Sequence, residues 1–158
     1  MKHIISVLVQ NKFGVLARIS GLFSARGFNI DSLAVGETDD PCISRMTIVV
    51  KGDDKILEQV TKQLRKLIET IKVQDFKKGE FVDRELVLVK LAVDSKTKPK
   101  IKRMLKKYPV RIADEGPDTM IIEIAASGEV TSDFMKALSG FKTIEMARTG
   151  KVALGKGK

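Results

Sequence analysis

Residues that usually carry enzyme chemistry are scarce in this sequence. Among 158 residues there is one histidine, His3, one cysteine, Cys42, and no tryptophan. A single thiol cannot form an intrachain disulfide, and one Cys with one His cannot complete a tetrahedral zinc site within one chain. A Ser–His–Asp or Cys–His apparatus would have to use His3, which precedes an apolar run and is interpreted as the start of a strand. The sequence therefore offers no catalytic residues and no metal site.

Long hydrophobic runs and nucleotide-binding glycine motifs are also absent. The N-terminal apolar stretch Ile4 to Val9 is six residues long and includes Ser6. A secretory signal needs about 7–15 apolar residues and a cleavage site, and a transmembrane helix needs 18 or more. There is no G-x-G-x-x-G and no P-loop, so no cofactor is expected in this chain. With one cysteine, which suits a reducing compartment, these absences predict a cytoplasmic protein.

The sequence does contain a repeated order of secondary-structure elements. The apolar periodicity predicts strand, helix, strand, strand, helix and strand over residues 3–9, 15–23, 28–35, 43–51, 56–68 and 71–76. The same order recurs after a charged junction at 77–85, over residues 86–93, 101–108, 110–113, 120–126, 130–141 and 143–147, with 152–154 also extended. We therefore expect an α+β protein made of two ferredoxin-like βαββαβ domains, residues 1–78 and 79–158.

Each predicted domain has helices on only one face of its antiparallel sheet. The strands are too uniformly apolar to leave the other face in water, and the first strand has apolar residues on both sides. Another domain or another copy of the chain should cover that face. A symmetric homodimer is the simplest expectation.

The loop between the first strand and the first helix is the best candidate for ligand binding. It reads Gln10-Asn11-Lys12-Phe13-Gly14-Val15-Leu16. Unpaired amides at a helix start carry partial positive charge and suit a small carboxylate. Asn11 could cap the helix or accept an ammonium group on its side-chain oxygen. A plain strand-to-helix turn remains the alternative on this spacing alone.

Two further features have both a structural and a functional interpretation. Asn29 is a residue disfavoured inside strands, and it either satisfies the turn after Gly27 or points at a polar ligand held at an interface. The segment from Lys96 to Lys107 holds seven basic residues and no acidic one, within a chain of net charge +9. It is interpreted as a solvated helix face or a contact with an acidic protein, because only Tyr108 could stack on a nucleic-acid base.

Several segments resemble the small subunit of acetolactate synthase (acetohydroxyacid synthase), whose N-terminal part is a regulatory ACT domain. In the first half they are Ile5 to Val9, Asn11, Gly14 to Ile19, Gly21 to Ser24, Arg26 to Leu33, Ser44 to Ile48 and Leu57 to Leu64. In the second half Arg84-Glu85-Leu86, Leu88 to Lys90 and Glu145 to Gly150 resemble the start and the end of that family's second domain. Phe13 is a departure, since relatives often have Pro or Ser there.

The resemblance implies a regulatory subunit with no active site of its own. Its partner would be a catalytic large subunit that carries thiamine diphosphate, Mg²⁺ and FAD, works in branched-chain amino acid biosynthesis, and is activated by the small subunit. Valine would be the feedback inhibitor, bound between two ACT domains of a homodimer. Its expected contacts are Asn11, Gly14, Val15, Leu16, Asn29 and Ile30. The alternative is a stand-alone ACT-type amino-acid sensor or a basic nucleic-acid-binding regulator.

Overall fold

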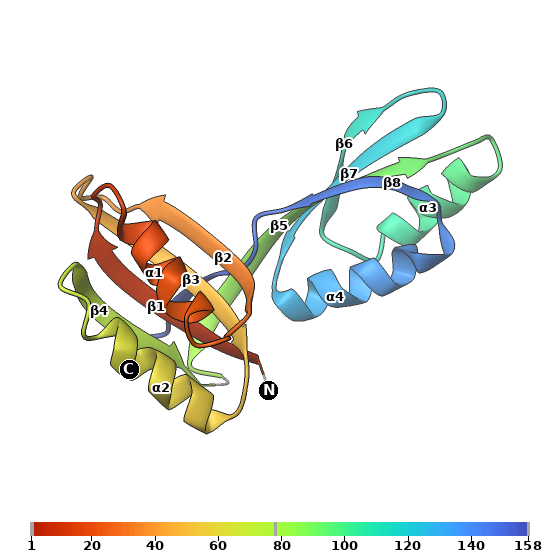
Figure 1. The fold of residues 1–158 in the computed structure, drawn as a ribbon. Coiled ribbons are helices and arrows are strands. Elements are labelled where there is room, and N and C mark those ends of the chain that lie inside the picture. Colours follow the sequence, from red (N-terminus) through yellow and green to blue (C-terminus); the bar gives the residue numbers. More distant parts are fainter. Residues whose placement is uncertain (1, 78, 158) are drawn as a thin grey trace. The chain divides into compact units, whose positions relative to one another are not determined.

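The computed structural model describes residues 2–77 and 79–157. They form two compact units (Figure 1), and the α+β class with two βαββαβ folds is confirmed. The first unit comprises residues up to Val82 together with those from Lys151 onward, and the second runs from Asp83 to Gly150. This differs from the expected division into 1–78 and 79–158, because the C-terminal tail belongs to the first unit.

The first unit is a four-stranded antiparallel sheet with two helices on one face. Its strands are β1 (Lys2–Gln10), β2 (Ile30–Glu37), β3 (Ile43–Lys51) and β4 (Thr70–Phe76), in the spatial order β2-β3-β1-β4. The helices are α1 (Val15–Ser24) and α2 (Asp54–Leu64). Alternate residues of β1 and β3 lie opposite each other on the helix side, Ile5 with Ile48 and Val7 with Met46, and form the core with Phe23 of α1.

The ends of these helices follow from local sequence. Gly14 has a φ of 81° and directly precedes α1. Gly27, with a φ of 68°, follows its end, and the Phe28 amide donates to the Phe23 carbonyl at 3.0 Å, which closes the helix. The Asp53 carboxylate accepts a hydrogen bond from the Ile56 amide at 2.9 Å and caps α2. Helix α2 ends at Leu64, four residues earlier than its apolar periodicity predicted.

The C-terminal tail covers part of the other face of the first sheet. There Ile4 lies opposite Val49, and the strand β9 (Val152–Gly155) buries Ala153 against this pair, with Phe76 and Phe81 packed beside it. The Lys151 amide donates to Ser32 Oγ at 3.1 Å and the Lys156 amide to the Glu80 carbonyl at 2.8 Å. The chain's own tail thus covers part of the face for which we expected a second copy or another domain.

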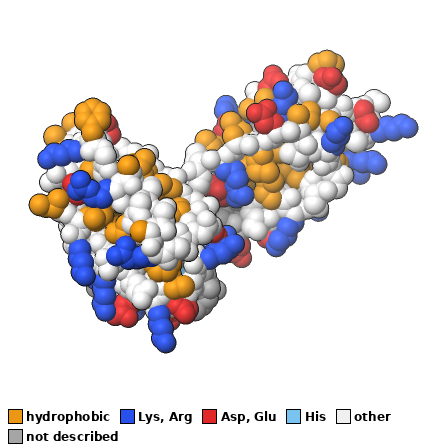
Figure 2. All heavy atoms as spheres, viewed as in Figure 1, with side chains coloured by type: hydrophobic (Ala, Val, Ile, Leu, Met, Phe, Trp, Pro, Cys, Tyr) orange, Lys and Arg blue, Asp and Glu red, His pale blue; other side chains and the backbone are white. Residues whose placement is uncertain are grey.

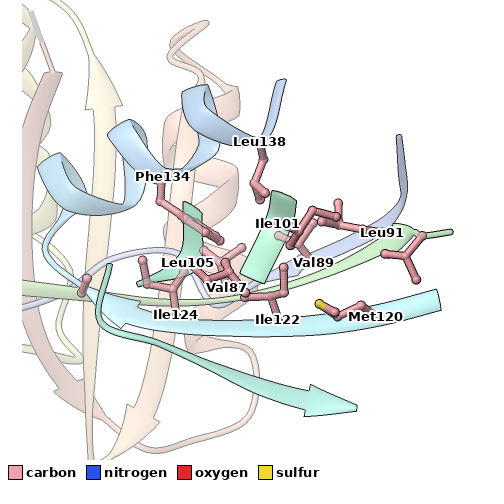
Figure 3. Close-up of a cluster of buried hydrophobic side chains, with 12 residues drawn as sticks. Val87, Val89, Leu91, Ile101, Leu105, Met120, Ile122, Ile124, Phe134 and Leu138 are labelled. Carbon is pink, nitrogen blue, oxygen red and sulfur yellow. The ribbon is translucent and has the colours of Figure 1, made fainter. Parts of the chain in front are cut away.

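The second unit repeats the fold with a separate core. Its sheet consists of β5 (Phe81–Ala92), β6 (Val110–Glu115), β7 (Thr119–Ala126) and β8 (Thr143–Arg148), in the order β6-β7-β5-β8, and β9 pairs with β5 as well. Helices α3 (Thr97–Leu105) and α4 (Gly128–Ala137), with the 3₁₀ turn η1 (Leu138–Gly140), cover one face. Figure 3 shows Val87, Val89 and Ile122 of the sheet beneath Ile101 of α3 and Phe134 of α4.

Candidate effector site

The turn at Gly14 presents free backbone amides at the start of α1. The Val15 amide makes only a long hydrogen bond, 3.4 Å, to the Lys12 carbonyl. In the part of the chain that the structure describes, no group accepts from the amides of Gly14, Leu16 or Ala17, and no side chain caps the helix. A Cβ built on Gly14 would meet no atom within 4 Å. These amides therefore have no acceptor among the described residues and lie at the positive end of the helix, where an anion is favoured.

Asn11 is held in a fixed orientation beside this turn. Its Nδ2 donates to Glu37 Oε1 at 3.0 Å and to the Pro41 carbonyl at 2.9 Å. Because both acceptors are oxygens, the amide nitrogen must face them, and Oδ1 is left as an acceptor. Asn11 is not the helix cap that the sequence allowed, since the capping position is Gly14. It is suited to accept a hydrogen bond from an ammonium group.

The apolar residues near the turn differ in what they can offer a ligand. Val15 is buried in the core, so only its backbone can face a bound molecule. Leu16 and Val35 are each 44% exposed. Val35 lies on the helix-covered face of β2, two residues before the Glu37 that holds Asn11. Phe13, at the tip of the loop, is fully exposed. Exposed apolar surface for a ligand therefore comes from residues other than Val15.

Asn29 and Ile30 lie at the opposite end of β2 from Asn11. Ile30 is the first residue of this strand and Glu37, the partner of Asn11, is the last. Eight residues of extended chain span about 23 Å between their first and last Cα atoms. The structure therefore brings together Asn11, Gly14, Val15 and Leu16 but not Asn29 and Ile30. A single chain cannot place both asparagines on one small ligand.

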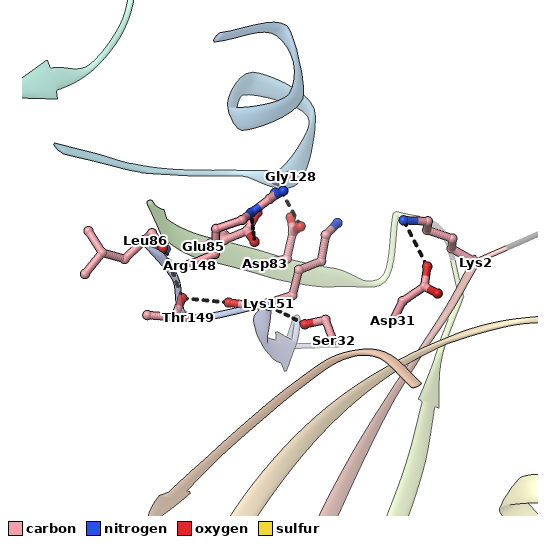
Figure 4. A network of polar contacts seen from close by, with 11 residues as sticks. Lys2, Asp31, Ser32, Asp83, Glu85, Leu86, Gly128, Arg148, Thr149 and Lys151 are labelled. Atoms are coloured by element: carbon pink, nitrogen blue, oxygen red, sulfur yellow. Dashed lines mark hydrogen bonds and ion pairs between the residues drawn. The ribbon is translucent and has the colours of Figure 1, made fainter. Parts of the chain in front are cut away.

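Asn29 belongs to a charged cluster at its end of the sheet. Its Nδ2 donates to Asp31 Oδ1 at 3.4 Å, so it does not close the turn after Gly27. Asp31 Oδ2 lies 3.1 Å from Lys2 Nζ and 3.7 Å from Lys51 Nζ, and Figure 4 shows the pair with Lys2. The hydrogen bond from Lys2, together with the charge of Lys51, lowers the pKa of Asp31. This end of the sheet keeps a carboxylate ionised beside the Asn29 amide.

Sequence reasoning missed the residues that position this site. Glu37 and Pro41, which hold Asn11, lie about 30 residues away in the chain. Arg18 of α1 forms an ion pair with Glu69, which precedes β4 and anchors the helix to that side of the sheet. Such pairs join segments far apart in the sequence, and no local pattern marks them. These contacts become predictable only once the pairing of β1, β2 and β4 within the sheet is known.

The described residues include no group of three or more His, Cys, Asp or Glu side chains placed to hold a metal ion. None of the helices within residues 2–77 and 79–157 is both long enough and apolar enough to cross a membrane. Cys42 is exposed and its thiol is free.

Comparison with known proteins matches both halves of the chain. Residues 5–72 match the acetohydroxyacid synthase small subunit-like ACT domain, and residues 84–157 match the small subunit of acetolactate synthase. A probable acetolactate synthase small subunit from Archaeoglobus fulgidus is 48% identical over 157 residues, which cover 99% of this chain and 98% of the relative. The isozyme 3 small subunit of Escherichia coli is 40% identical over 158 residues, covering 99% and 97%.

A solved structure shows the same architecture. The acetolactate synthase small subunit from Thermotoga maritima is 38% identical, superposes with a TM-score of 0.90, and covers 100% of this chain and 99% of its own. The agreement extends over both units and the tail. The chain belongs to the acetolactate synthase small-subunit family.

Proposed function

We propose that this chain is the regulatory subunit of acetolactate synthase, which activates the catalytic large subunit and transmits feedback inhibition by valine. The observation that carries the effector site is the Gly14 turn, whose Gly14, Leu16 and Ala17 amides have no acceptor among the described residues and lie beside the fixed Asn11 side chain. A free α-amino acid has a carboxylate for the amides and an ammonium for the Asn11 oxygen. The chain supplies no catalytic residues of its own, and thiamine diphosphate, Mg²⁺ and FAD belong to the cytoplasmic large subunit.

A second copy supplies the missing half of the site in this proposal. β2 is an edge strand that pairs with β3 on one side. Antiparallel pairing of β2 with its own copy about a two-fold axis would set Ile30 of one strand near Glu37 of the other. The Asn29 of one protomer would then approach the Asn11–Gly14 loop of its partner. In this proposal the site needs a dimer because about 23 Å separates the two groups within one chain.

The apolar side chains around the loop favour a branched aliphatic effector. Leu16 and Val35 are exposed and uncharged. They can contact an isopropyl group, together with Ile30 from the partner. The Glu37 carboxylate is already occupied by Asn11, which leaves it poorly placed to select a second cationic group on the ligand. We therefore expect valine to bind more tightly than lysine or aspartate.

Two measurements on the full chain test this function. The first is the activity of the catalytic subunit with and without this chain, titrated with valine. Activation by the chain and inhibition by valine only in its presence are expected. The second is calorimetry with valine, leucine, isoleucine and lysine as titrants. An absence of activation would refute the regulatory role, whereas activation without valine binding would refute only the effector assignment.

A further inference from the structure

Helix α3 of the second unit presents a row of basic side chains that packing does not explain. Its inner side is apolar, with Ile101 and Leu105 buried in the core. The residues of the row are spaced four, three and four positions apart, so that they lie along one side of the helix. They are Lys96, which directly precedes α3, Lys100 and Arg103 within it, and Lys107, two residues after its end, all exposed. In Figure 2 blue side chains stand out from the surface where Figure 1 shows α3.

A second set of lysines on the same helix behaves differently. Lys98 Nζ and Lys102 Nζ lie 3.0 and 2.9 Å from Glu115 Oε1. Lys98 also donates to the Gly116 carbonyl at 3.0 Å. These two lysines attach α3 to the end of β6. Among the described residues, no carboxylate lies within ion-pair distance of any member of the first row, although the charge of Lys100 helps to lower the pKa of Asp94.

The first row works against the stability of its own helix. Residues four or three positions apart are neighbours on a helix surface, and like charges there repel. Lys100 also lies near the start of the helix, where the macrodipole disfavours positive charge. The helix begins because Asp94 caps it, accepting from the Lys96 amide at 2.8 Å and the Thr97 amide at 2.6 Å. In water this repulsion costs the helix little, and an acidic partner surface would turn it into attraction.

A protein partner fits this row better than a nucleic acid does. The aromatic ring at the end of the helix, Tyr108, is packed edge-on against Phe134 at a centroid distance of 5.3 Å, so it is not free to stack on a base. Glu115 on the neighbouring β6 is paired with Lys98 and Lys102, so the surface beside the row carries both charges. Mixed charge beside a basic row is typical of complementary protein surfaces.

We propose that the α3 row, Lys96, Lys100, Arg103 and Lys107, docks on an acidic surface of the catalytic large subunit. This inference rests on the proposed regulatory function and deepens it by assigning the contact to one helix of the second unit. Exposed charges at the edge of an interface act mainly on the association rate and lose their effect as salt is added. The row therefore steers assembly of the two subunits.

The test compares two full-length triple variants. The first is Lys100→Gln, Arg103→Gln, Lys107→Gln on α3. The control is Lys55→Gln, Arg65→Gln, Lys66→Gln on and just after α2, where the side chains are also exposed and form no ion pair among the described residues. Both remove two lysines and one arginine. Gln keeps helix propensity close to that of Lys and Arg, so the fold should persist in both.

Binding to the purified catalytic subunit is measured at about 50, 150 and 500 mM salt, where the Debye length falls from about 14 to 4 Å. At 50 mM salt we expect the α3 variant to bind at least tenfold more weakly than the wild type, because its association rate is lower. At 500 mM salt the two should bind almost equally. The control should bind like the wild type. Its thermal stability and that of the α3 variant should match or exceed the wild type.

Four outcomes would overturn the proposal. If the wild type binds and the α3 variant binds equally well, the row is not the docking surface, although the regulatory function stands. If both variants weaken binding equally, only overall charge matters. If the wild type does not bind the catalytic subunit, the regulatory function fails as well. Retention of a 20-nucleotide RNA that depends on the α3 row at 150 mM salt would assign the row to nucleic acid instead.

Discussion

Arg148 and Glu85 form a two-point ion pair that joins the last strand of the second sheet to its first. Arg148 Nε lies 3.0 Å from Glu85 Oε1, and Nη2 lies 2.9 Å from Oε2 (Figure 4). Beside it the Thr149 amide donates to the Leu86 carbonyl at 3.1 Å, and the Leu86 amide donates to Thr149 Oγ1 at 3.1 Å. Two sequence segments that resemble the small-subunit family thus meet in space. Their role in this structure is to close the second unit.

Replacement of Arg148 should destabilise the second unit. The Glu85 side chain is 7% exposed, so Arg148→Ala leaves a carboxylate with little water and no charged partner. We expect a loss of about 1.5–3 kcal/mol, typical of a hydrogen bond to a charged group. Urea denaturation, with hydrogen exchange of the β5 and β8 amides, measures it. Arg84→Ala is the control, because within the described residues exposed Arg84 donates only to the Asp83 carbonyl, and its effect should stay within about 0.5 kcal/mol.

Acid should weaken the start of α3 through Asp94. Hydrogen bonds from Thr97, first from its amide and then from its hydroxyl, and from the Lys96 amide lower the pKa of Asp94. A carboxyl whose pKa is lower in the folded state stabilises that state above its unfolded value of about 3.9. That stabilisation is lost as the pH falls through the lower folded value. Asp94→Ala should therefore reduce the melting temperature at pH 7.

The effect of the same substitution should shrink as the pH falls below about 3.9 and the wild-type carboxyl becomes protonated. At pH 7 the melting temperature of Asp94→Asn, whose side chain can still accept a hydrogen bond, should lie between those of the wild type and Asp94→Ala. Thermal melts from pH 2 to 7 measure the difference. An Asp94→Ala effect that does not depend on pH would show that the carboxylate charge is irrelevant to the cap.

A carboxylate at position 14 should prevent valine binding. Gly14→Asp would place a negative charge beside the amides that are proposed to hold the ligand carboxylate. Gly14→Asn has nearly the same size, tolerates the positive φ of 81° about as well, and carries no charge. Calorimetry should show at least a 10- to 100-fold loss of affinity for Gly14→Asp, the equivalent of one charge-assisted hydrogen bond. Equal affinities of the two variants for valine would argue against a carboxylate at this turn.

Mixing two variants that each bind valine weakly should restore part of the wild-type binding. Asn11→Ala and Asn29→Ala should each weaken binding as pure homodimers. A heterodimer of the two has one site with both changes and one site that is intact, if each site takes its asparagines from different protomers. Random exchange of chains should then return roughly a quarter of all sites to wild-type affinity. If mass spectrometry confirms that the chains have exchanged but valine binding does not recover, the two asparagines do not belong to a shared site.

A charge at Ala153 should detach the tail from the first sheet. Ala153 is 4% exposed, in contact with the Ile4–Val49 pair, so Ala153→Asp would bury an unpaired carboxylate. Leu154→Asp is the control, because Leu154 is 58% exposed. Hydrogen exchange at the Lys151 and Lys156 amides should accelerate at least tenfold in the first variant only. Unchanged exchange there would mean that Ala153 does not hold β9 in place.

The element order and both cores followed from the sequence because they depend on local periodicity. Ile5, Val7 and Val9 alternate along β1 as predicted, and Gly14 and Gly27 have the positive φ that marks the two ends of α1. The position of the tail did not follow, because four residues of extended chain carry no signal for which sheet they join. Ala153 is a small residue that is buried against Ile4 and Val49, which lie more than 100 residues earlier.

Only part of the candidate site could be predicted from the sequence. The Gly14 amides could be predicted, because a glycine before an amphipathic helix leaves them free. The orientation of Asn11 depends on Glu37 and Pro41, which only the β1–β3 and β2–β3 registers bring near. The Val15 side chain is buried in the core, so only the backbone part of its predicted ligand contact fits the structure.

The tail strand also sets an order of events during translation. Residues 83–150, the whole second unit, leave the ribosome between the main part of the first unit and β9. At about 5–20 residues per second, these roughly 70 residues take about 4–14 s to synthesise. Throughout that interval β9 is not yet available to cover Ile4 and Val49. The tail can therefore join the first unit only after the residues of the second unit have been synthesised.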